Sequence, residues 1–271
     1  VLGSAKMKDL EEMKAHNICL NIVEQEADTD EPLTETFIRQ VHQVMLREDY
    51  TVYRKLPGGE TTSYTVHAGR YKTRPNSVIT ATGERFEYAS PEETPALMAD
   101  LVAWYNEAAV SGILTPIQLA ALFHYRYIRI HPFEDGNGRI ARLMVNFVLR
   151  RHQWPMMVIR SKNKRAYLNA LALADASVGP IPADGAHASL QSISPFADYM
   201  ENALTADISA MIEFLSGDHD TTWWYEGGIV RFSTSTPGTY SPYTSIQSRC
   251  LTLDYIHNLR HQSLCNSKAS G

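Results

Sequence analysis

Hydrophobic residues recur every three or four positions along most of the first 215 residues. This spacing gathers them on one side of a helix, where they can pack against a core. Two start signals support it: Ser90 with Glu93 forms a capping-box pattern, and Thr115 precedes a proline at a first helical position. The pattern predicts a mainly α-helical chain, with helices over residues 6–26, 33–46, 91–104, 116–130, 138–151, 162–174 and 195–211.

Two regions depart from helical spacing. Residues 64–88 are rich in Thr, Val and Tyr, and residues 78–80 and 85–87 flank a Thr-Gly turn signal, which predicts a short β-hairpin. Residues 221–271 are rich in Ser, Thr and Tyr, with one helix expected near 251–259.

These patterns divide the chain into three expected parts. Residues 1–60 form a helical region that packs on the core, residues 61–215 form the core domain, and residues 216–271 form an extension whose structure the pattern does not specify.

Composition adds few constraints. The 271 residues are 44% hydrophobic and 20% charged, with a formal net charge of −5, which is typical of a globular protein. An acidic chain does not favour nucleic acid or an anionic membrane as partner, and no apolar run approaches the roughly 20 residues of a membrane span. The three cysteines match no metal-ligand spacing. We therefore expect a cytoplasmic protein with free thiols.

The segment HPFEDGNGRIAR, residues 131–142, carries the strongest chemical signal. Gly136 and Gly138 flank Asn137 between two predicted helices, so successive N–H groups can converge on an anion, and the next helix adds its own free N–H groups. Arg139 and Arg142 are three residues apart and can project from the same side of that helix. Cations near a helix N-terminus are disfavoured by roughly 0.3–1 kcal/mol each, so their presence there indicates a multiply charged anion such as a di- or triphosphate.

Two further side chains complete this hypothesis. Asp135 would repel phosphates unless a cation intervened, and Mg²⁺ held by one carboxylate plus phosphates resolves that conflict. His131 could act as general base for an incoming hydroxyl. Pro132 and Phe133 would fix the loop between them in the core. The reaction class that follows is phosphoryl or nucleotidyl transfer.

The same segment resembles the signature of the Fic (Fido) family, His-Pro-Phe-x-Asp/Glu-Gly-Asn-Gly-Arg-x-x-Arg, and departs from it nowhere. HAGRYKTRPNSV, which begins at His67, resembles the approach to the family's flap, and the resemblance extends from about Lys6 to Met211. It implies an all-α core with a β-hairpin flap. It also implies transfer of AMP from ATP to a Ser, Thr or Tyr hydroxyl of a target protein whose identity the sequence does not give.

The resemblance assigns a role to each residue of the motif. His131 would deprotonate the target hydroxyl, and Asp135 would bind Mg²⁺ that bridges the α- and β-phosphates. The backbone of Gly136, Asn137 and Gly138 would hold phosphates. Arg139 and Arg142 would neutralise the β- and γ-phosphates.

Residues outside the motif also receive roles from the resemblance. The flap at Val78, Ile79, Thr80 and Ala81 would hold the target backbone by strand addition. Tyr167 and Asp175 fall where the family places nucleoside contacts, although Asp175 stands where an Asn is often found. Relatives often dimerise, so a homodimer is an additional expectation.

Many relatives carry an inhibitory helix with the pattern Ser/Thr-x-x-x-Glu-Gly/Asn, whose Glu pairs with the second motif arginine, here Arg142. The helix would lie upstream of Val1, or in the sequence that starts at Thr222, where Glu226 fits the pattern. We therefore expect an autoinhibited adenylyltransferase. The alternatives are removal of AMP by the same site, transfer of another nucleotide or phosphate group, and a non-catalytic nucleotide-responsive regulator.

Overall fold

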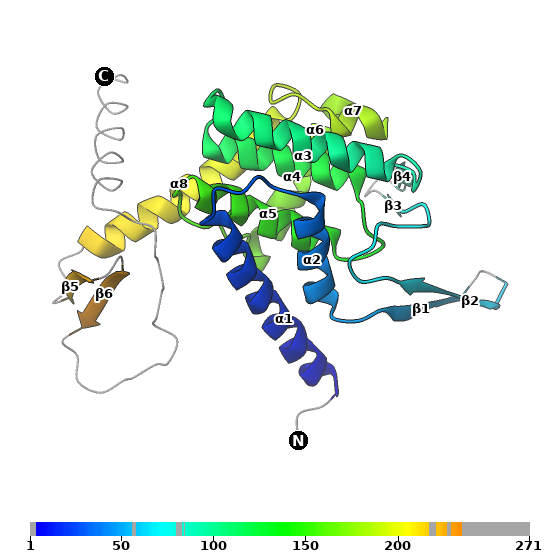
Figure 1. Ribbon diagram of the computed structural model, residues 1–271, viewed down its shortest axis with the longest axis horizontal. Coiled ribbons are helices and arrows are strands. Elements are labelled where there is room, and N and C mark those ends of the chain that lie inside the picture. Colours follow the sequence, from blue (N-terminus) through cyan, green and yellow to red (C-terminus); the bar gives the residue numbers. More distant parts are fainter. Residues whose placement is uncertain are drawn as a thin grey trace.

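The computed structural model describes residues 4–55, 58–79, 83, 85–216, 221–226 and 229–234. Most of these residues are helical, as expected (Figure 1). The helices are α1 (Ser4–Ala27), α2 (Glu35–Leu46), α3 (Thr94–Ser111), α4 (Pro116–Ile130), α5 (Asn137–Arg151), α6 (Lys164–Val178), α7 (Pro182–Ala186) and α8 (Ser194–Ser216). A 3-10 turn, Ser161–Asn163, precedes α6.

Helices α4 and α5 lie at the centre of the fold. The two pack on each other; α3, α7 and α8 pack on α4, while α1 packs on α5 and α2 (Figure 1). Large apolar side chains of both central helices are fully buried, including Phe123, Tyr127, Ile140 and Phe147. The motif loop therefore joins the two most buried helices, and its ends are held by the core.

Capping hydrogen bonds form before two of the helices, and at α4 they mark where the helix begins. The Thr115 hydroxyl accepts a hydrogen bond from the Gln118 N–H, and the Gln118 side chain accepts one from the Thr115 N–H. Ser90 and Glu93 form the same reciprocal pair at 3.0 and 3.2 Å. Helix α3 nevertheless begins only at Thr94, because a turn over residues 91–93 comes first.

The strands form three antiparallel pairs in the described part of the chain. The expected hairpin is confirmed: Val78 pairs with Phe86 in the register of the second pair, and Thr80 and Ala81 of the expected flap lie outside the described residues. The pairs are β1 (Tyr50–Lys55) with β2 (Thr61–Val66), β3 (Ser77–Ile79) with β4 (Arg85–Glu87), and β5 (Thr221–Glu226) with β6 (Ile229–Thr234).

The β1–β2 hairpin was not expected from the sequence, and it extends away from the helical body (Figure 1). The expected boundary between residues 60 and 61 falls in the turn of this hairpin. The sequence pattern did not specify the structure of residues 221–226 and 229–234, which form strands β5 and β6. The helix expected near 251–259 lies outside the described residues. No helix among the described residues combines the length and apolar character needed to cross a bilayer.

Candidate active site

His131 occupies an unusual backbone conformation at the end of α4. It is the C-cap residue, with φ 52° and ψ 61°, and its N–H donates to the Tyr127 carbonyl at 2.9 Å. A left-handed conformation is uncommon for a residue with a Cβ and is retained only where the surroundings fix it. The chain turns here from α4 into the motif loop, so this conformation decides where the imidazole points.

Lys72 and Asn76 hold that turn from the segment that leads into β3. Lys72 is 3% exposed, and its Nζ donates to the Ile130 carbonyl at 3.0 Å and to the His131 carbonyl at 2.9 Å. Asn76 accepts a third bond from Lys72 and donates to the Phe133 carbonyl at 2.9 Å. Ammonium groups at helix C-termini satisfy the last carbonyls and interact favourably with the helix dipole. The strand that begins the flap is thereby tied to the His131 loop.

The His131 ring is held between the flap and the core. Tyr88, just after β4, stacks on it with ring centroids 3.9 Å apart and planes 10° from parallel. Burial lowers the pKa of His131 to about 4, and the positive charge of Lys72 acts in the same direction. The imidazole is therefore neutral at pH 7, which is the state a general base requires.

The rest of the loop closes on itself. Phe133 is fully buried and stacks on His42 with centroids 3.7 Å apart. The Asn137 side chain accepts from the Phe133 N–H at 2.9 Å and donates to the Phe133 carbonyl at 2.6 Å. The Asn137 side chain is thus used to close the loop, and only its backbone is free to meet a phosphate.

His42 of α2 fixes the turn at Asp135 and Gly136. Its Nδ1 accepts from the Gly69 N–H at 2.9 Å, so Nε2 carries the proton and donates to the Asp135 carbonyl at 3.0 Å. Burial lowers the pKa of His42 to about 4, which keeps it neutral. Gly136 has φ 79°, and a Cβ there would approach His42 Nε2 to 3.4 Å, so both backbone and space favour glycine.

The Asp135 carboxylate accepts hydrogen bonds from two side chains and from the Gly136 backbone. Its Oδ2 accepts from the Tyr50 hydroxyl at 2.6 Å and from Arg139 Nη2 at 3.3 Å. Burial acts to raise the pKa of Asp135, but the hydrogen bonds from Tyr50 and the Gly136 backbone, with the Arg139 charge, outweigh it and lower the pKa. The carboxylate is ionised at neutral pH and its side chain is 49% exposed, so it can reach a ligand from solvent.

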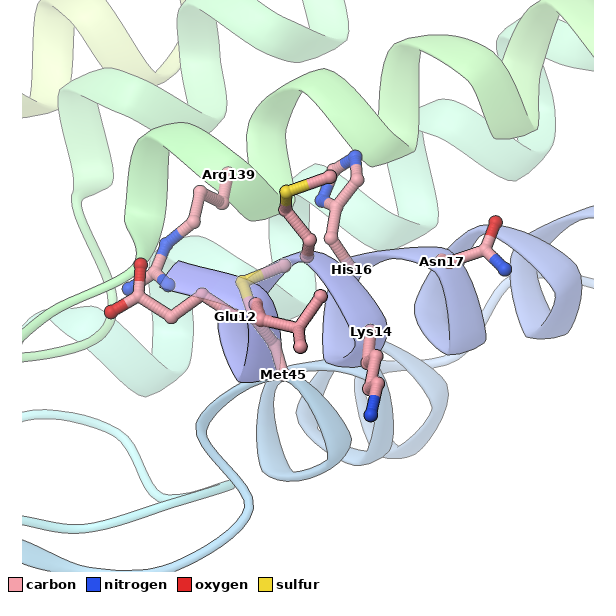
Figure 2. A pocket seen from close by; sticks show the side chains of 8 residues that line it. Glu12, Lys14, His16, Asn17, Met45 and Arg139 are labelled. Atoms are coloured by element: carbon pink, nitrogen blue, oxygen red, sulfur yellow. The ribbon is translucent and has the colours of Figure 1, made fainter. Parts of the chain in front are cut away.

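Arg139 lies in the first turn of α5 and Arg142 in the second. Arg139 lines an open groove of about 710 Å³ between α5 and the first half of α1. Figure 2 shows the end of the Arg139 side chain beside that of Glu12, with His16 further along α1. Burial and the charges of Arg142 and Arg139 lower the pKa of His16. Arg139 thus supplies positive charge on the α5 side of the groove, and Glu12 lies opposite it on the α1 side.

Tyr167 and Asp175 have partners within the fold. The Tyr167 hydroxyl lies 2.9 Å from Nε2 of the buried His124, and Tyr167 is 5% exposed. Asp175 accepts from the Tyr125 hydroxyl at 2.8 Å and from Arg129 Nη1 at 3.3 Å. Both residues therefore support the walls of the core, and their contact with a nucleoside stays a prediction.

The donor set fits a magnesium ion bound mainly by phosphates and water. No group of three or more His, Cys, Asp or Glu side chains that could hold a metal comes together in the described part of the chain. Asp135 supplies one ionised, half-exposed carboxylate next to the arginines. Magnesium commonly uses one or two carboxylates and completes its coordination with phosphates and water.

Sequence reasoning missed the residues that hold the loop from outside it. Tyr50, Lys72, Asn76 and Tyr88 lie 43 to 85 positions from their partners in the motif loop. His42 offered a signal, because it is a polar ring on the apolar face of α2 between buried neighbours. The resemblance named the segment from His67 onward, but only for its approach to the flap.

The chain is similar to known proteins in both sequence and structure. Residues 32–149 match the model of the Fic/DOC family. The structure resembles a Fic domain containing signaling protein from Bacteroides thetaiotaomicron, with a TM-score of 0.71 and 54% identity, covering 79% of this chain and 75% of that one. The chain is 30% identical over 155 residues to protein adenylyltransferase fic-1 of Caenorhabditis elegans, covering 57% of this chain and 27% of the relative. The corresponding protein of Caenorhabditis briggsae is 26% identical over 174 residues, covering 64% and 30%. The chain thus spans about three tenths of the length of these curated relatives.

Proposed function

The chain belongs to the Fic/DOC family, and on that premise we propose that it transfers AMP from Mg-ATP to a Ser, Thr or Tyr hydroxyl of a target protein. Curated relatives from nematodes and insects, 26–39% identical over the matched parts, are named protein adenylyltransferase. This naming supports nucleotidyl transfer as the reaction class. The target protein is not identified by any residue of the site.

His131 acts as the general base. Its neutral imidazole takes the proton of the target hydroxyl, and the oxygen forms a bond to the α-phosphorus of ATP. The bond from the α-phosphorus to its bridging oxygen breaks, and pyrophosphate leaves with that electron pair. The left-handed turn at His131 and the stack on Tyr88 keep the ring in one orientation during this step.

The start of α5 binds the triphosphate. The N–H groups of Arg139 and Ile140 donate to the Gly136 carbonyl, so those of Asn137 and Gly138 are the ones that would meet the phosphates, together with the Arg139 and Arg142 side chains. Asp135 would hold Mg²⁺, which neutralises phosphate charge when bound. The observation that carries the proposal is the buried, neutral His131 at one end of a loop whose other end presents Asp135 and Arg139.

Autoinhibition belongs to the same proposal. A glutamate of an inhibitory segment would pair with Arg142 and block the productive position of the γ-phosphate. Glu226 is the last residue of strand β5, whereas the resemblance implies a helix, and its side chain lies outside those described. We therefore favour sequence upstream of Val1 as the source of the inhibitory glutamate.

The reaction class is tested by following each phosphate separately. The purified chain is incubated with Mg²⁺, a cell lysate and ATP labelled at either the α- or the γ-phosphate, with lysate alone as control. We expect protein labelling that depends on the chain from α-labelled ATP only. Labelling from γ-labelled but not α-labelled ATP would make the protein a kinase and overturn the proposal.

A further inference from the structure

We propose that Tyr50, at the root of the β1–β2 hairpin, is a positioning residue that orients the Asp135 carboxylate for a divalent cation. The inference rests on the proposed function only in taking Asp135 as the residue that holds Mg²⁺. It assigns a role in the site to a hairpin that neither the sequence pattern nor the motif anticipated.

The end of the hairpin that joins the helical body, residues 49–50 and 66–68, is held by several contacts, and these fix the position of Tyr50. Tyr50 pairs with Val66 in the strand register, and Val66 is 1% exposed. One residue earlier, Asp49 accepts from the Ala68 N–H at 2.8 Å and lies 2.6 Å from His67 Nδ1. These contacts tie both strands together where they leave the helical body, while the far end of the hairpin extends away from it (Figure 1).

From this root the Tyr50 hydroxyl donates to Asp135 Oδ2 at 2.6 Å. Arg139 Nη2 is the other side-chain donor to the same oxygen, at 3.3 Å. Among the described residues both side-chain hydrogen bonds to Asp135 thus fall on Oδ2, and the Gly136 backbone adds a further hydrogen bond to the carboxylate. A carboxylate held by one oxygen cannot rotate freely, and such outer hydrogen bonds orient metal ligands in many proteins.

The two donors differ in what they do once a nucleotide binds. Arg139 carries a positive charge that repels a divalent cation, and in the proposed function it turns toward the phosphates. The Tyr50 hydroxyl is neutral, so it holds Oδ2 without that repulsion. Tyr50 is therefore the donor that stays on Asp135 in the loaded site.

Tyr53 provides a matched control on the same strand. It lies three positions further along β1 and is 72% exposed, whereas Tyr50 is 37% exposed. Residues an odd number of positions apart point to opposite faces of a strand, so Tyr53 faces away from the side that carries Tyr50. Tyr50→Phe and Tyr53→Phe each remove one hydroxyl group from β1, but only the Tyr50 hydroxyl donates to Asp135.

The test measures cation binding without turnover. Free Mn²⁺ is followed by electron paramagnetic resonance in the presence of α,β-methylene-ATP, which cannot release AMP. We expect Tyr50→Phe to weaken Mn²⁺ retention by about tenfold, the usual loss for an outer-shell partner, and Tyr53→Phe to match the wild type. The affinity for α,β-methylene-ATP without metal should be the same in all three proteins, which a general distortion of the site would not give.

A double-mutant cycle shows whether Tyr50 acts through Asp135. In an Asp135→Asn background, Tyr50→Phe should cause no further loss of Mn²⁺. Wild-type Mn²⁺ affinity in Tyr50→Phe, or an equal loss in the Asp135→Asn background, overturns the inference. If Tyr50→Phe lowers Mn²⁺ affinity as expected but no AMP transfer is found, the proposed function fails and this inference stands. If AMP transfer is found and Tyr50→Phe retains full Mn²⁺ affinity, only this inference fails.

Discussion

The backbone of His131 is the residue-scale feature on which the site depends. Its left-handed conformation is fixed by one buried ammonium, because Lys72 donates to the carbonyls of both Ile130 and His131. Burial lowers the pKa of Lys72 to about 8 and the negative charge of Glu93 acts against this, so the amine is mostly protonated at pH 7. Lys72 therefore affects His131 in two ways, by geometry and by charge.

Lys72→Met removes the charge that helps to lower the pKa of His131. We expect the pKa of His131 to rise from about 4 while staying below 6.5, because burial, the larger cause, remains. The pKa is read from the imidazole signals in an NMR titration, assigned with His131→Ala. Lys55→Met, which removes an exposed lysine at the end of β1, should leave the titration unchanged. An unaltered pKa in Lys72→Met would remove Lys72 from this role.

At the scale of elements, the sequence predicted the helices that carry the site and missed what holds them in place. Apolar spacing and the Thr115 cap predicted α4, and the glycines before Arg139 predicted the start of α5 within one residue. Strand β1 is almost wholly exposed and lacks the alternation of apolar and polar residues that marks a strand, and β2 alternates only weakly, with Val66 as its one buried residue. The available signal in the sequence was Pro-Gly-Gly between two runs rich in Thr and Tyr.

The motif residues could be identified from the sequence because they lie within twelve positions of one another. Their supports could not, because contacts such as Lys72 with His131 join elements far apart in the chain. The expected nucleoside contacts Tyr167 and Asp175 show the same limit. Their hydrogen bonds to His124 and Arg129 join α6 to α4 through long side chains, which spacing does not reveal.

The packing of α7 on α4 depends on one glycine. Arg129 of α4 is 1% exposed and donates to the carbonyls of Gly179 and Ile181 at 2.8 Å each, while its guanidinium lies over the Phe86 ring of β4. A Cβ on Gly185 would overlap with the Arg129 side chain. The arginine joins α4, the loop before α7 and the flap, so it has little room to move.

Gly185→Ala should lower the free energy of unfolding by roughly 1–3 kcal/mol, the usual cost of overpacking. Gly58→Ala, where a Cβ would meet no atom within 4 Å, is the matched control and should change it by less than about 0.5 kcal/mol. Both values come from urea denaturation. Equal stability of the two variants would show that Arg129 is not confined as described.

For the whole molecule, the buried histidines make stability depend on pH. Burial lowers the pKa of His42 and His131 to about 4 and that of His124 to about 3, all below the ordinary 6.5. Below pH 6.5 the unfolded chain binds protons that the folded chain does not. As the pH falls from 6.5 toward the pKa in the folded state, each of these groups therefore lowers the free energy of unfolding by about 1.4 kcal/mol per pH unit.

We expect the free energy of unfolding to fall by about 4–6 kcal/mol between pH 6.5 and pH 5, from three such groups. The measurement is urea denaturation at a series of pH values. His124→Phe, which removes one of these buried rings, should reduce the slope. A free energy of unfolding that stays constant between pH 6.5 and pH 5 would mean that these rings are protonated in the folded protein.

The general base is tested most directly by removing the His131 imidazole and measuring binding and transfer on the same preparations. In His131→Ala we expect AMP transfer from α-labelled ATP to fall by at least about 100-fold, the usual contribution of a general base. The dissociation constant for α,β-methylene-ATP should not change, because Arg139, Arg142 and the α5 N-terminus remain, and His187→Ala should behave as the wild type. Equal AMP transfer by His131→Ala and the wild type would contradict the assignment of His131 as the base.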